Sequence, residues 1–501
     1  MLTDILKPNK YSISRFLGIL TVALCLCVAC GKSGTKPPPE PPQPPLPQDV
    51  LDTLVILSTN DVHAFIDNMP KEAAYIQSMQ KRYPRVLVLS AGDIFSGNPV
   101  VDQYQPRGYP MRSLMQISGY QLMSLGNHDF DYGQEALSDW LAQASFPALC
   151  ANADFSQSPL KDKVKPYKVL NVNGVKVVIL GLIQMGGAQS IPSTAPSNVT
   201  GISFRNGVTE FIRYRSLRDS GAVFIVLSHL GIDADRQLAA QYPEIDMIIG
   251  GHSHTLLNPS ELRNGVLITQ SGSNHSHIGN SMLILRNGKL ATKSSLNVPL
   301  NSLTAIDTRV QDSVRKYQNS PWLQRVIGQA SSAITGKEAL GSLMTDAMTH
   351  RHNLDLAFTN SGGIRVSSIP QGDITVAMVY ELDPFENEVV VYDLSLAEIT
   401  RMLQYACRYN ETDWLISGGR YTWHTGSKTV SLVDYQGNPL RNDRRYLVGM
   451  NSYMAETYMN QVSTEKAGQS LFVTCSSTLI DYIEEMKVVA PQSRRTFIDN
   501  Q

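Results

Sequence analysis

From residue 51 onwards, short apolar runs rich in β-branched residues alternate with longer segments of mixed character. Each run is followed directly by a small polar cluster, as in "TLVILSTNDVH", "RVLVLSAGD", "YQLMSLGNHDFD", "AVFIVLSHL" and "IDMIIGGHSHT". Runs this short and continuous are typical of strands buried on both faces. Between them, residues 71–82 and 134–144 have the pattern of helices. The alternation predicts a layered α/β domain.

The polar clusters at the ends of these runs contain groups that bind metals or move protons. They hold Asp61, His63, Asp93, Asn127, His128, Asp129, Asp131, His229, His252 and His254. In α/β sheets, ligands bind outside the carboxyl ends of the strands. Five of the ten histidines fall at such a point. Their shared position favours a common functional site over separate surface or hydrogen-bonded histidines.

The types of side chain in these clusters indicate the chemistry. Imidazole and carboxylate groups without thiolates suit divalent ions such as Zn²⁺ or Mn²⁺. Five histidines, two aspartates and an asparagine exceed the needs of one ion, and a single aspartate can bridge two ions. Two ions about 3.5–4 Å apart activate a water as hydroxide and neutralise charge during in-line displacement at phosphorus. A neighbouring acid–base or donor side chain would assist the leaving oxygen.

Five motifs, "TNDVHA", "AGD", "GNHDFD", "LSHLG" and "GGHSHT", resemble in this order the metal motifs of the calcineurin-like metallophosphoesterases. They are most similar to those of the 5′-nucleotidase family. The resemblance implies one metal held by Asp61, His63, Asp93 and His254. It implies a second metal held by Asp93, Asn127, His229 and His252, so that Asp93 bridges the two ions.

The resemblance gives other roles to the remaining residues of the clusters. His128 matches the family's catalytic histidine, which is not a metal ligand, and Asp131 matches the carboxylate that orients it. Asp129 is then expected to support the loop rather than bind metal. A further His-x-His pair, His275 and His277, matches no ligand position, and we expect it to lie at the surface or at the rim of the site.

Around residue 300 the rhythm of strands ends. Residues 301–335 are predicted to form a linker whose helix carries Ile306, Val310, Val314 and Tyr317 on one face. Residues 336–501 again resemble the 5′-nucleotidases, in "GSLMTDAM", "TNSGGIR", "DPFENEVVV" and "LISGGRYTW". The expected fold is a layered α/β-β/α metallophosphoesterase sandwich over residues 51–300, followed by a smaller α+β C-terminal substrate-binding domain.

The resemblance also implies which residues of the second domain present a nucleotide. Asn360 and Arg365 would contact it, with Arg365 near the phosphate, where a guanidinium group suits phosphate oxygens. Phe385 matches one of the two aromatic residues that sandwich the nucleobase, and Tyr453 is the expected counterpart. Stacking of this kind contributes roughly 1–3 kcal/mol per base and tolerates different bases.

Three features depart from the family pattern. The stretch "MAETYMNQVSTEKAGQS" stands where family members usually have a Gly-Gly-Asp-Gly segment. Where the family has an arginine before the "GSLMTDAM" motif, this chain has only Lys337 nearby. Within that motif, Ser342 stands where Asn is common. The metal motifs are intact. These departures therefore bear on the preference for 5′-mononucleotides more than on phosphoester hydrolysis itself.

The first 50 residues are not predicted to belong to the fold. Basic residues precede an apolar run from Phe16 to Ala29, which is shorter than the roughly 20 residues of a bilayer-spanning helix and suits a secretory signal peptide. The segment before Cys30 resembles a bacterial lipobox, so we expect a lipoprotein-type signal peptide over residues 1–30 with lipidation at Cys30. Plain secretion is the alternative. Residues 31–50 form a Pro-rich spacer.

The net charge of −1 gives no large basic surface for a nucleic-acid polymer. We predict a lipid-anchored, extracytoplasmic phosphohydrolase with two divalent metal ions, a 5′-nucleotidase that releases nucleoside and phosphate by metal-hydroxide attack. Alternative substrates are a 2′,3′-cyclic nucleotide, a nucleotide sugar or another phosphoester. A surface lipoprotein that captures nucleotides or metals without turnover is the alternative of another class. No protein partner is predicted.

Overall fold

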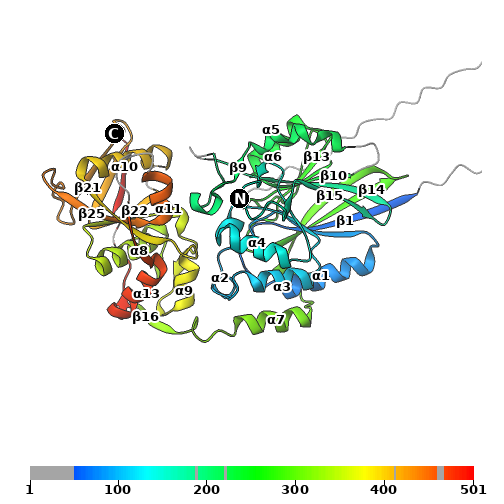
Figure 1. Ribbon diagram of the computed structural model, residues 1–501. Coiled ribbons are helices and arrows are strands. Elements are labelled where there is room, and N and C mark those ends of the chain that lie inside the picture. The colour runs from blue at the N-terminus through cyan, green and yellow to red at the C-terminus, as the bar shows by residue number, and fades with distance from the viewer. Residues whose placement is uncertain are drawn as a thin grey trace, which may run out of the picture. The chain divides into compact units, whose positions relative to one another are not determined.

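Two β-sheets formed by the first half of the chain lie against each other (Figure 1). The computed structural model describes residues 50–186, 190–218, 223–410, 413–459, 468–492 and 494–500, all within one compact unit, Asp49–Gln501. One sheet has the order β15 (Lys289–Pro299), β14 (His277–Arg286), β1 (Leu51–Thr59), β2 (Val86–Ser90), β3 (Leu122–Ser124), β4 (Ala148–Leu149) and β6 (Val164–Lys165). The other has the order β12 (Glu261–Arg263), β13 (Val266–Thr269), β11 (Met247–Ile249), β10 (Val223–His229), β8 (Val175–Ile183) and β7 (Tyr167–Val172).

Strand β1 shows why the apolar runs are continuous. Leu54 and Ile56 belong to the core between the two sheets, whereas the alternate residues Val55 and Leu57 belong to the core under the helices on the other face. Because side chains alternate between the faces of a strand, a strand buried on both faces needs an apolar residue at every position. The strands β1, β2, β3, β4 and β6 pair in parallel, and so do β8, β10, β11 and β13.

Helices cover the outer face of each sheet, which confirms the predicted α/β-β/α sandwich (Figure 1). Over the first sheet lie α1 (Met69–Arg82), α2 (Pro99–Asp102), α3 (Tyr109–Ser118), α4 (Gly133–Gln143) and α7 (Thr308–Gln318). Over the second lie α5 (Gly207–Glu210) and α6 (Ile232–Gln241). A short ladder joins β5 (Ala153–Asp154) to β9 (Ser203–Phe204). The helices predicted over residues 71–82 and 134–144 correspond to α1 and α4.

Helix α7 begins later than its apolar pattern suggested. Val310, Val314 and Tyr317 are buried against the first sheet's helices, as predicted. Ile306 was wrongly placed on the same face, since it lies before the helix and is 45% exposed. The reason is Asp307, whose side chain accepts hydrogen bonds from the backbone N–H groups of residues 309 and 310 and so fixes the start of the helix after itself.

The second half of the chain folds as an α+β assembly. Its largest sheet has the order β22 (Trp414–Ser417), β18 (Leu356–Asn360), β25 (Arg445–Asn451), β21 (Glu388–Ser395) and β26 (Gln469–Thr474). Smaller sheets contain β20 (Gly372–Thr375), β16 (Val326–Ala330) and β27 (Val488–Val489); β24 (Thr429–Val433), β23 (Arg420–His424) and β28 (Thr496–Asp499); and β17 (Ile334–Thr335) with β19 (Ser368–Ile369). The helices are α8 (Lys337–His352), α9 (Val376–Leu382), α10 (Leu396–Asn410), α11 (Ser452–Met454) and α13 (Cys475–Met486).

Within the described ranges, no helix has both the length and the apolar character required to cross a bilayer. The predicted signal peptide, lipidation site and spacer lie outside the described residues. Cys150, Cys407 and Cys475 are buried and form no disulfide within the described part of the chain, so packing rather than a disulfide framework holds these parts of the fold.

Candidate active site

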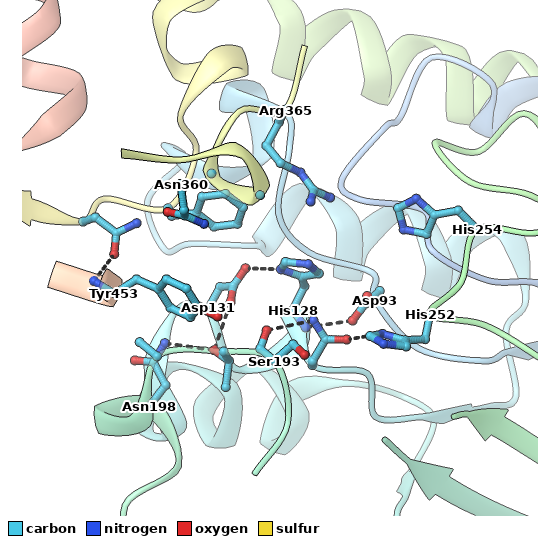
Figure 2. A pocket seen from close by; sticks show the side chains of 17 residues that line it. Asp93, His128, Asp131, Ser193, Asn198, His252, His254, Asn360, Arg365 and Tyr453 are labelled. Atoms are coloured by element: carbon cyan, nitrogen blue, oxygen red, sulfur yellow. Dashed lines mark hydrogen bonds and ion pairs between the residues drawn. The ribbon is translucent and has the colours of Figure 1, made fainter. Parts of the chain in front are cut away.

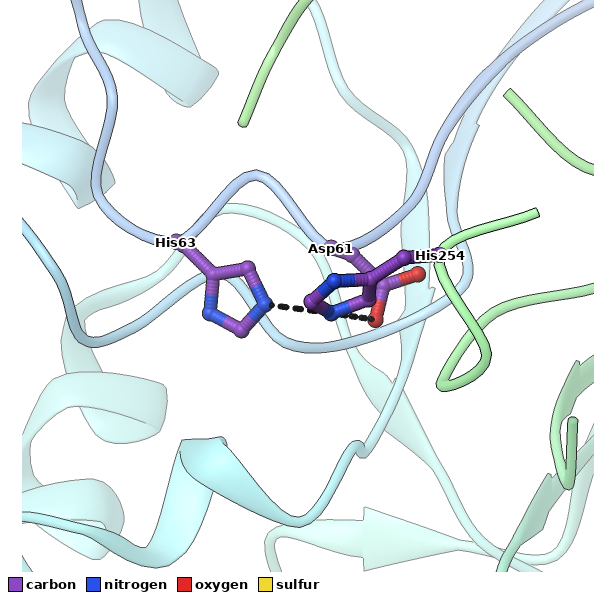
Figure 3. Close-up of side chains that lie close together, drawn as sticks. All are labelled: Asp61, His63 and His254. Atoms are coloured by element: carbon purple, nitrogen blue, oxygen red, sulfur yellow. Dashed lines mark hydrogen bonds and ion pairs between the residues drawn. The ribbon is translucent and has the colours of Figure 1, made fainter. Parts of the chain in front are cut away.

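The predicted metal residues gather at the carboxyl ends of strands from both sheets. Asp61 follows β1 and Asp93 follows β2, whereas His229 is the last residue of β10 in the other sheet. The ligand-type atoms of these three side chains lie within 4.8 Å of one another. The same is true of Asp61, His63 and His254, which Figure 3 shows facing each other.

Short distances connect the members of this cluster. They join His229 Nε2 to Asp93 Oδ2 at 3.0 Å, His63 Nε2 to His254 Nε2 at 3.0 Å, and His252 Nδ1 to Asn127 Oδ1 at 2.9 Å. The backbone N–H of His252 also donates to Asp61 Oδ1 at 3.0 Å. All seven predicted ligands therefore belong to one continuous cluster, which we call the metal cluster.

The backbone of the metal cluster is unusual. Positive φ angles occur at Asp61 (48°), His63 (50°), Asp93 (52°), His252 (73°) and His254 (55°). Residues other than glycine seldom adopt this left-handed region, and each instance costs on the order of 1–3 kcal/mol. Five such residues within one cluster indicate that the loop conformations serve to orient these side chains, at a cost in stability.

The charge states of His252, His254 and Asp93 suit a divalent cation, whereas, against the effect of burial, Asp93 raises the pKa of His229 to about 10. Burial lowers the pKa of His252 and of His254 to about 4, so both imidazoles are neutral and keep a lone pair at neutral pH. Although burial opposes it, His229 and His128 hold the pKa of Asp93 well below its usual range. His229 Nδ1 donates to the backbone oxygen of Ala91 at 2.7 Å, which aims the buried Nε2 at the carboxylates, 3.0 Å from Asp93 Oδ2.

His128 and Asp131 form a dyad beside the metal cluster (Figure 2). His128 Nδ1 lies 2.7 Å from Asp131 Oδ2, and the backbone N–H of His128 donates to Asp93 Oδ1 at 2.7 Å. Burial lowers the pKa of His128, but the carboxylates of Asp131 and Asp93 outweigh it and raise the pKa above its ordinary value. The dyad is therefore equipped to keep a proton on the imidazole while it donates a hydrogen bond.

Asp129 lies between the dyad residues in sequence but turns away from the cavity. Its fully buried carboxylate accepts hydrogen bonds from the backbone N–H groups of Asp93 (3.2 Å), Ile94 (2.9 Å) and Gly126 (2.7 Å). The first two groups belong to the loop after β2, and the third belongs to the loop after β3. Asp129 thus clamps together the two loops that carry Asp93 and Asn127.

A cavity of about 290 Å³ extends from the metal cluster and the dyad to the second half of the chain (Figure 2). Its lining includes all four residues predicted to bind substrate, namely Asn360, Arg365, Phe385 and Tyr453. The ring of Phe385 stacks on that of His128, with centroids 5.7 Å apart, and the guanidinium carbon of Arg365 lies 5.6 Å from the Phe385 centroid. A cation, an aromatic face and the dyad thus share one cavity.

Comparison with known proteins matches two separate parts of the chain. Residues 54–256 match the family model described as calcineurin-like phosphoesterase, and residues 325–462 match the model described as 5′-nucleotidase, C-terminal domain. The chain belongs to the 5′-nucleotidase family. Both halves of the family architecture are present and in the family order.

Individual relatives match this chain over most of its length. The 5′-nucleotidase precursor of Thermus thermophilus has a similar structure, with a TM-score of 0.77, 28% identity, and coverage of 90% of this chain and 100% of that chain. The 5′-nucleotidase of Diplobatis ommata is 25% identical, over 89% of this chain and 90% of the relative. The trifunctional nucleotide phosphoesterase protein YfkN of Bacillus subtilis is 29% identical over 81% of this chain, which spans only 32% of that protein.

One departure from the family pattern lies at the start of α8, and another lies partly outside the described residues. Lys337 begins α8, and its ammonium group donates to the backbone oxygen of Ser361 at 2.6 Å. It lines a second cavity of about 570 Å³ together with Arg365, His63 and His254. Lys337 therefore lies beside Arg365, the arginine predicted to bind phosphate. Burial and the charge of Arg365 lower the pKa of Lys337. The segment that replaces Gly-Gly-Asp-Gly is described only up to residue 459 and from residue 468.

The expectation that His275 and His277 lie at the surface or rim is wrong for His275, which is 2% exposed. His275 Nε2 lies 2.9 Å from Glu72 Oε2, and its Nδ1 lies 3.1 Å from the backbone oxygen of Phe65. The hydroxyl of Tyr120 donates to the other oxygen of Glu72 at 2.5 Å. His275 can be buried because Glu72 of α1, far away in sequence, binds its imidazole. No local sequence pattern indicated this partner.

Sequence reasoning missed part of the cavity wall. Ser193, Thr194, Ala195 and Asn198 also line the cavity. They lie in "SIPSTAPSNVT", which contains a short 3₁₀ helix, Pro196–Val199, but not the apolar run that marked the other site residues. Asn387 also lines the cavity, and its place in "DPFENEVVV", two residues after Phe385, was a usable signal.

Proposed function

We propose that this protein is a two-metal 5′-nucleotidase that hydrolyses nucleoside 5′-monophosphates to nucleoside and phosphate. The observation that carries the proposal is the single cavity that connects the metal cluster, the His128–Asp131 dyad and the pair Arg365 and Phe385. A phosphate group at the metal cluster would have its nucleoside on the aromatic side of this cavity. The chemistry of a phosphomonoesterase and a binding surface for a base are therefore within reach of one small molecule.

The metal cluster fits two divalent ions, of which Zn²⁺ and Mn²⁺ suit the donors best. One ion would be held by Asp61, His63, Asp93 and His254, and the other by Asp93, Asn127, His229 and His252. When bound, the ions would supply an activated water and would neutralise charge on the phosphoryl oxygens. The neutral imidazoles of His252 and His254 and the ionised Asp93 support this assignment.

The dyad would stabilise the charge that develops during the reaction. Asp131 accepts a hydrogen bond from Nδ1–H of His128, which fixes the ring and leaves Nε2 for the substrate. A protonated His128 would then donate from Nε2 to the phosphoryl group and to the leaving oxygen. Positioned acid–base groups of this kind contribute roughly 10²–10⁴-fold to rates.

Substrate binding would involve both charge and stacking. Arg365, with Lys337 nearby, would bind phosphate oxygens, and Asn360 would bind the sugar or the base. Asn360 is held in place because its Oδ1 accepts a hydrogen bond from Asn451 Nδ2 at 3.0 Å. Phe385 and Tyr453 would contact the faces of the base, and stacking of this kind would accept different bases.

We also propose where the enzyme works and how its chain is divided. The sequence pattern supports a signal peptide over residues 1–30, lipidation at Cys30, a spacer over residues 31–50 and an extracytoplasmic location. The metallophosphoesterase domain would comprise residues 51–300, and the linker residues 301–335 would connect it to the substrate-binding domain, residues 336–501. Labelling with a radioactive fatty acid in cells, abolished by Cys30→Ser, would test the anchor.

A substrate panel tests the activity. Purified protein is loaded with Mn²⁺ or Zn²⁺ and offered nucleoside 5′-monophosphates, a 2′,3′-cyclic nucleotide, a nucleotide sugar and an aryl phosphate, and release of phosphate is measured. We expect the highest kcat/KM with 5′-monophosphates. A preference for the cyclic nucleotide or the nucleotide sugar would correct the substrate, and tight nucleotide binding without any turnover would replace the enzyme by a capture protein.

A further inference from the structure

The segment of residues 193–198 forms the wall of the cavity nearest the dyad, and we call it the cavity-wall segment (Figure 2). It is tied to the metal cluster through the backbone oxygen of Ser193, which accepts a hydrogen bond from Asn127 Nδ2 at 3.0 Å. Gln184 Nε2 also donates to the hydroxyl of Ser193 at 2.6 Å. The segment therefore has a defined position relative to the site although it has no strand of its own.

A chain of three hydrogen bonds leads from the cavity-wall segment into the dyad. Asn198 Nδ2 donates to Thr194 Oγ1 at 3.3 Å, Thr194 Oγ1 donates to Asp131 Oδ1 at 3.2 Å, and Asp131 Oδ2 accepts from His128 Nδ1 at 2.7 Å. The direction is fixed, because a carboxylate only accepts and the threonine hydroxyl must then turn its lone pairs to the amide. Thr194 is 5% exposed, so water has little access to this chain.

The position of Thr194 on the carboxylate matters. Ser96 Oγ and His128 both bind Oδ2 of Asp131, at 2.6 and 2.7 Å. Among the described residues, the Thr194 hydroxyl makes the one hydrogen bond found on Oδ1. It therefore opposes rotation of the Asp131 carboxylate about its Cβ–Cγ bond. Because threonine is β-branched, few other rotamers are open to its side chain, and the hydroxyl stays near Oδ1.

Asn198 connects these three hydrogen bonds to the cavity. Its side chain lines the cavity while its Nδ2 binds Thr194. The amide oxygen would therefore be available to accept a hydrogen bond from a bound molecule. A hydroxyl on the sugar of a nucleoside leaving group has the chemistry to donate it.

We infer that Thr194 is a positioning residue for the His128–Asp131 dyad and that Asn198 determines specificity by contacting the sugar of the leaving nucleoside. The inference rests on the proposed phosphomonoesterase function and deepens it. A nucleoside that binds Asn198 would tighten the contact to Thr194 and hence to Asp131. Recognition of the leaving group and orientation of the dyad would then be coupled through one segment.

The test uses Thr194→Val, which removes the hydroxyl and keeps the shape, and Thr194→Ser, which keeps the hydroxyl. Thr200→Val is the matched control, because Thr200 lies next to the same segment and is exposed, and its hydroxyl donates to the backbone oxygens of Pro196 and Ser197. Each variant of the metal-loaded full chain is assayed with adenosine 5′-monophosphate and with p-nitrophenyl phosphate. The second substrate has no sugar, and its nitrophenolate leaving group delocalises its own charge.

We expect Thr194→Val to lower kcat for the nucleotide roughly 10-fold or more, as for loss of a hydrogen bond to a charged group, with KM changed less than about 2-fold. Thr194→Ser should restore most of kcat, and the loss should be clearly smaller with p-nitrophenyl phosphate. Asn198→Ala should instead raise KM for the nucleotide roughly 5-fold and leave KM for p-nitrophenyl phosphate unchanged. Thr200→Val should match the wild type throughout.

Different failures have different meanings. If the wild type releases phosphate from neither substrate, the proposed function fails and the inference falls with it. If the wild type is active, the inference alone is overturned by Thr194→Val with undiminished kcat, by equal losses for Thr194→Val and Thr194→Ser, or by equal losses with both substrates. Should Thr194→Val not fold, Thr194→Ala serves in its place, with thermal unfolding of each variant recorded beside Thr200→Val.

Discussion

Replacement of Asp129 by alanine separates a structural role from metal binding within the "GNHDFD" motif. The carboxylate of Asp129 is fully buried and accepts three backbone hydrogen bonds, from Asp93, Ile94 and Gly126. Alanine would leave all three N–H groups without an acceptor at the junction of the loops after β2 and β3. Because these loops carry Asp93 and Asn127, the loss should reach both the stability of the fold and the affinity for metal.

The magnitude follows from the three hydrogen bonds. A buried donor without a partner costs about 1–3 kcal/mol, so three such donors give about 3–9 kcal/mol. Water entering the vacated space would keep the loss near the lower end, about 3–5 kcal/mol. Asp129→Asn keeps one oxygen and turns an amide N–H₂ toward at least one donor, so it should cost about 1–3 kcal/mol.

The assay is urea unfolding of each variant in EDTA, followed by measurement of bound metal after reloading. Asp139→Ala is the matched control, since Asp139 is an exposed aspartate on the nearby helix α4. In EDTA, where no metal is bound, we expect Asp129→Ala to lose the most unfolding free energy, Asp129→Asn less, and the control Asp139→Ala the least. If Asp129→Ala lost metal but unfolded like the control in EDTA, Asp129 would be a metal ligand and the clamp would be refuted.

Three further predictions follow from the contacts around the site. His275→Ala should lower the unfolding free energy by about 3–5 kcal/mol, since it leaves the buried carboxylate of Glu72 without its imidazole; a loss below about 1 kcal/mol in urea unfolding would contradict this. Gly126→Ala should reduce bound metal, because a Cβ there would meet Asp93 Oδ1 and lie 2.5 Å from Asp93 N; unchanged metal content by elemental analysis would contradict this. Arg365→Ala should raise KM for nucleotides by roughly 10-fold or more, with Arg365→Lys intermediate; unchanged KM in steady-state assays would remove Arg365 from the phosphate site.

The layered half of the fold was readable because its pattern has a simple physical cause. Continuous apolar runs such as that of β1 are needed when a strand is covered on both faces, and polar residues then appear where the strand ends. The parallel pairing of β1, β2 and β3 brings the residues that follow these strands to one edge. For that reason Asp61, Asp93 and His128 could be placed near each other from sequence alone.

Other parts of the site depend on contacts that no local pattern carries. Thr194 lies in an irregular segment, and its importance comes from a hydrogen bond to Asp131, 63 positions away. His275 is buried because Glu72 of α1 reaches it across 203 positions. The start of α7 was misjudged at Ile306 because the capping side chain of Asp307 outweighs the apolar repeat. Side-chain partners decide each of these cases, and they are known only once the chain is folded.

The most direct measurement compares phosphate release from adenosine 5′-monophosphate by the metal-loaded wild type and by His128→Ala, with bound metal determined in both. His128 faces the cavity beside the metal cluster but is not assigned as a ligand. We expect the wild type to release equal amounts of nucleoside and phosphate, and His128→Ala to be slower by roughly 10²–10⁴-fold with its metal content unchanged. No release by the wild type, or undiminished release by His128→Ala, would contradict the proposed two-metal nucleotidase with a His128–Asp131 dyad.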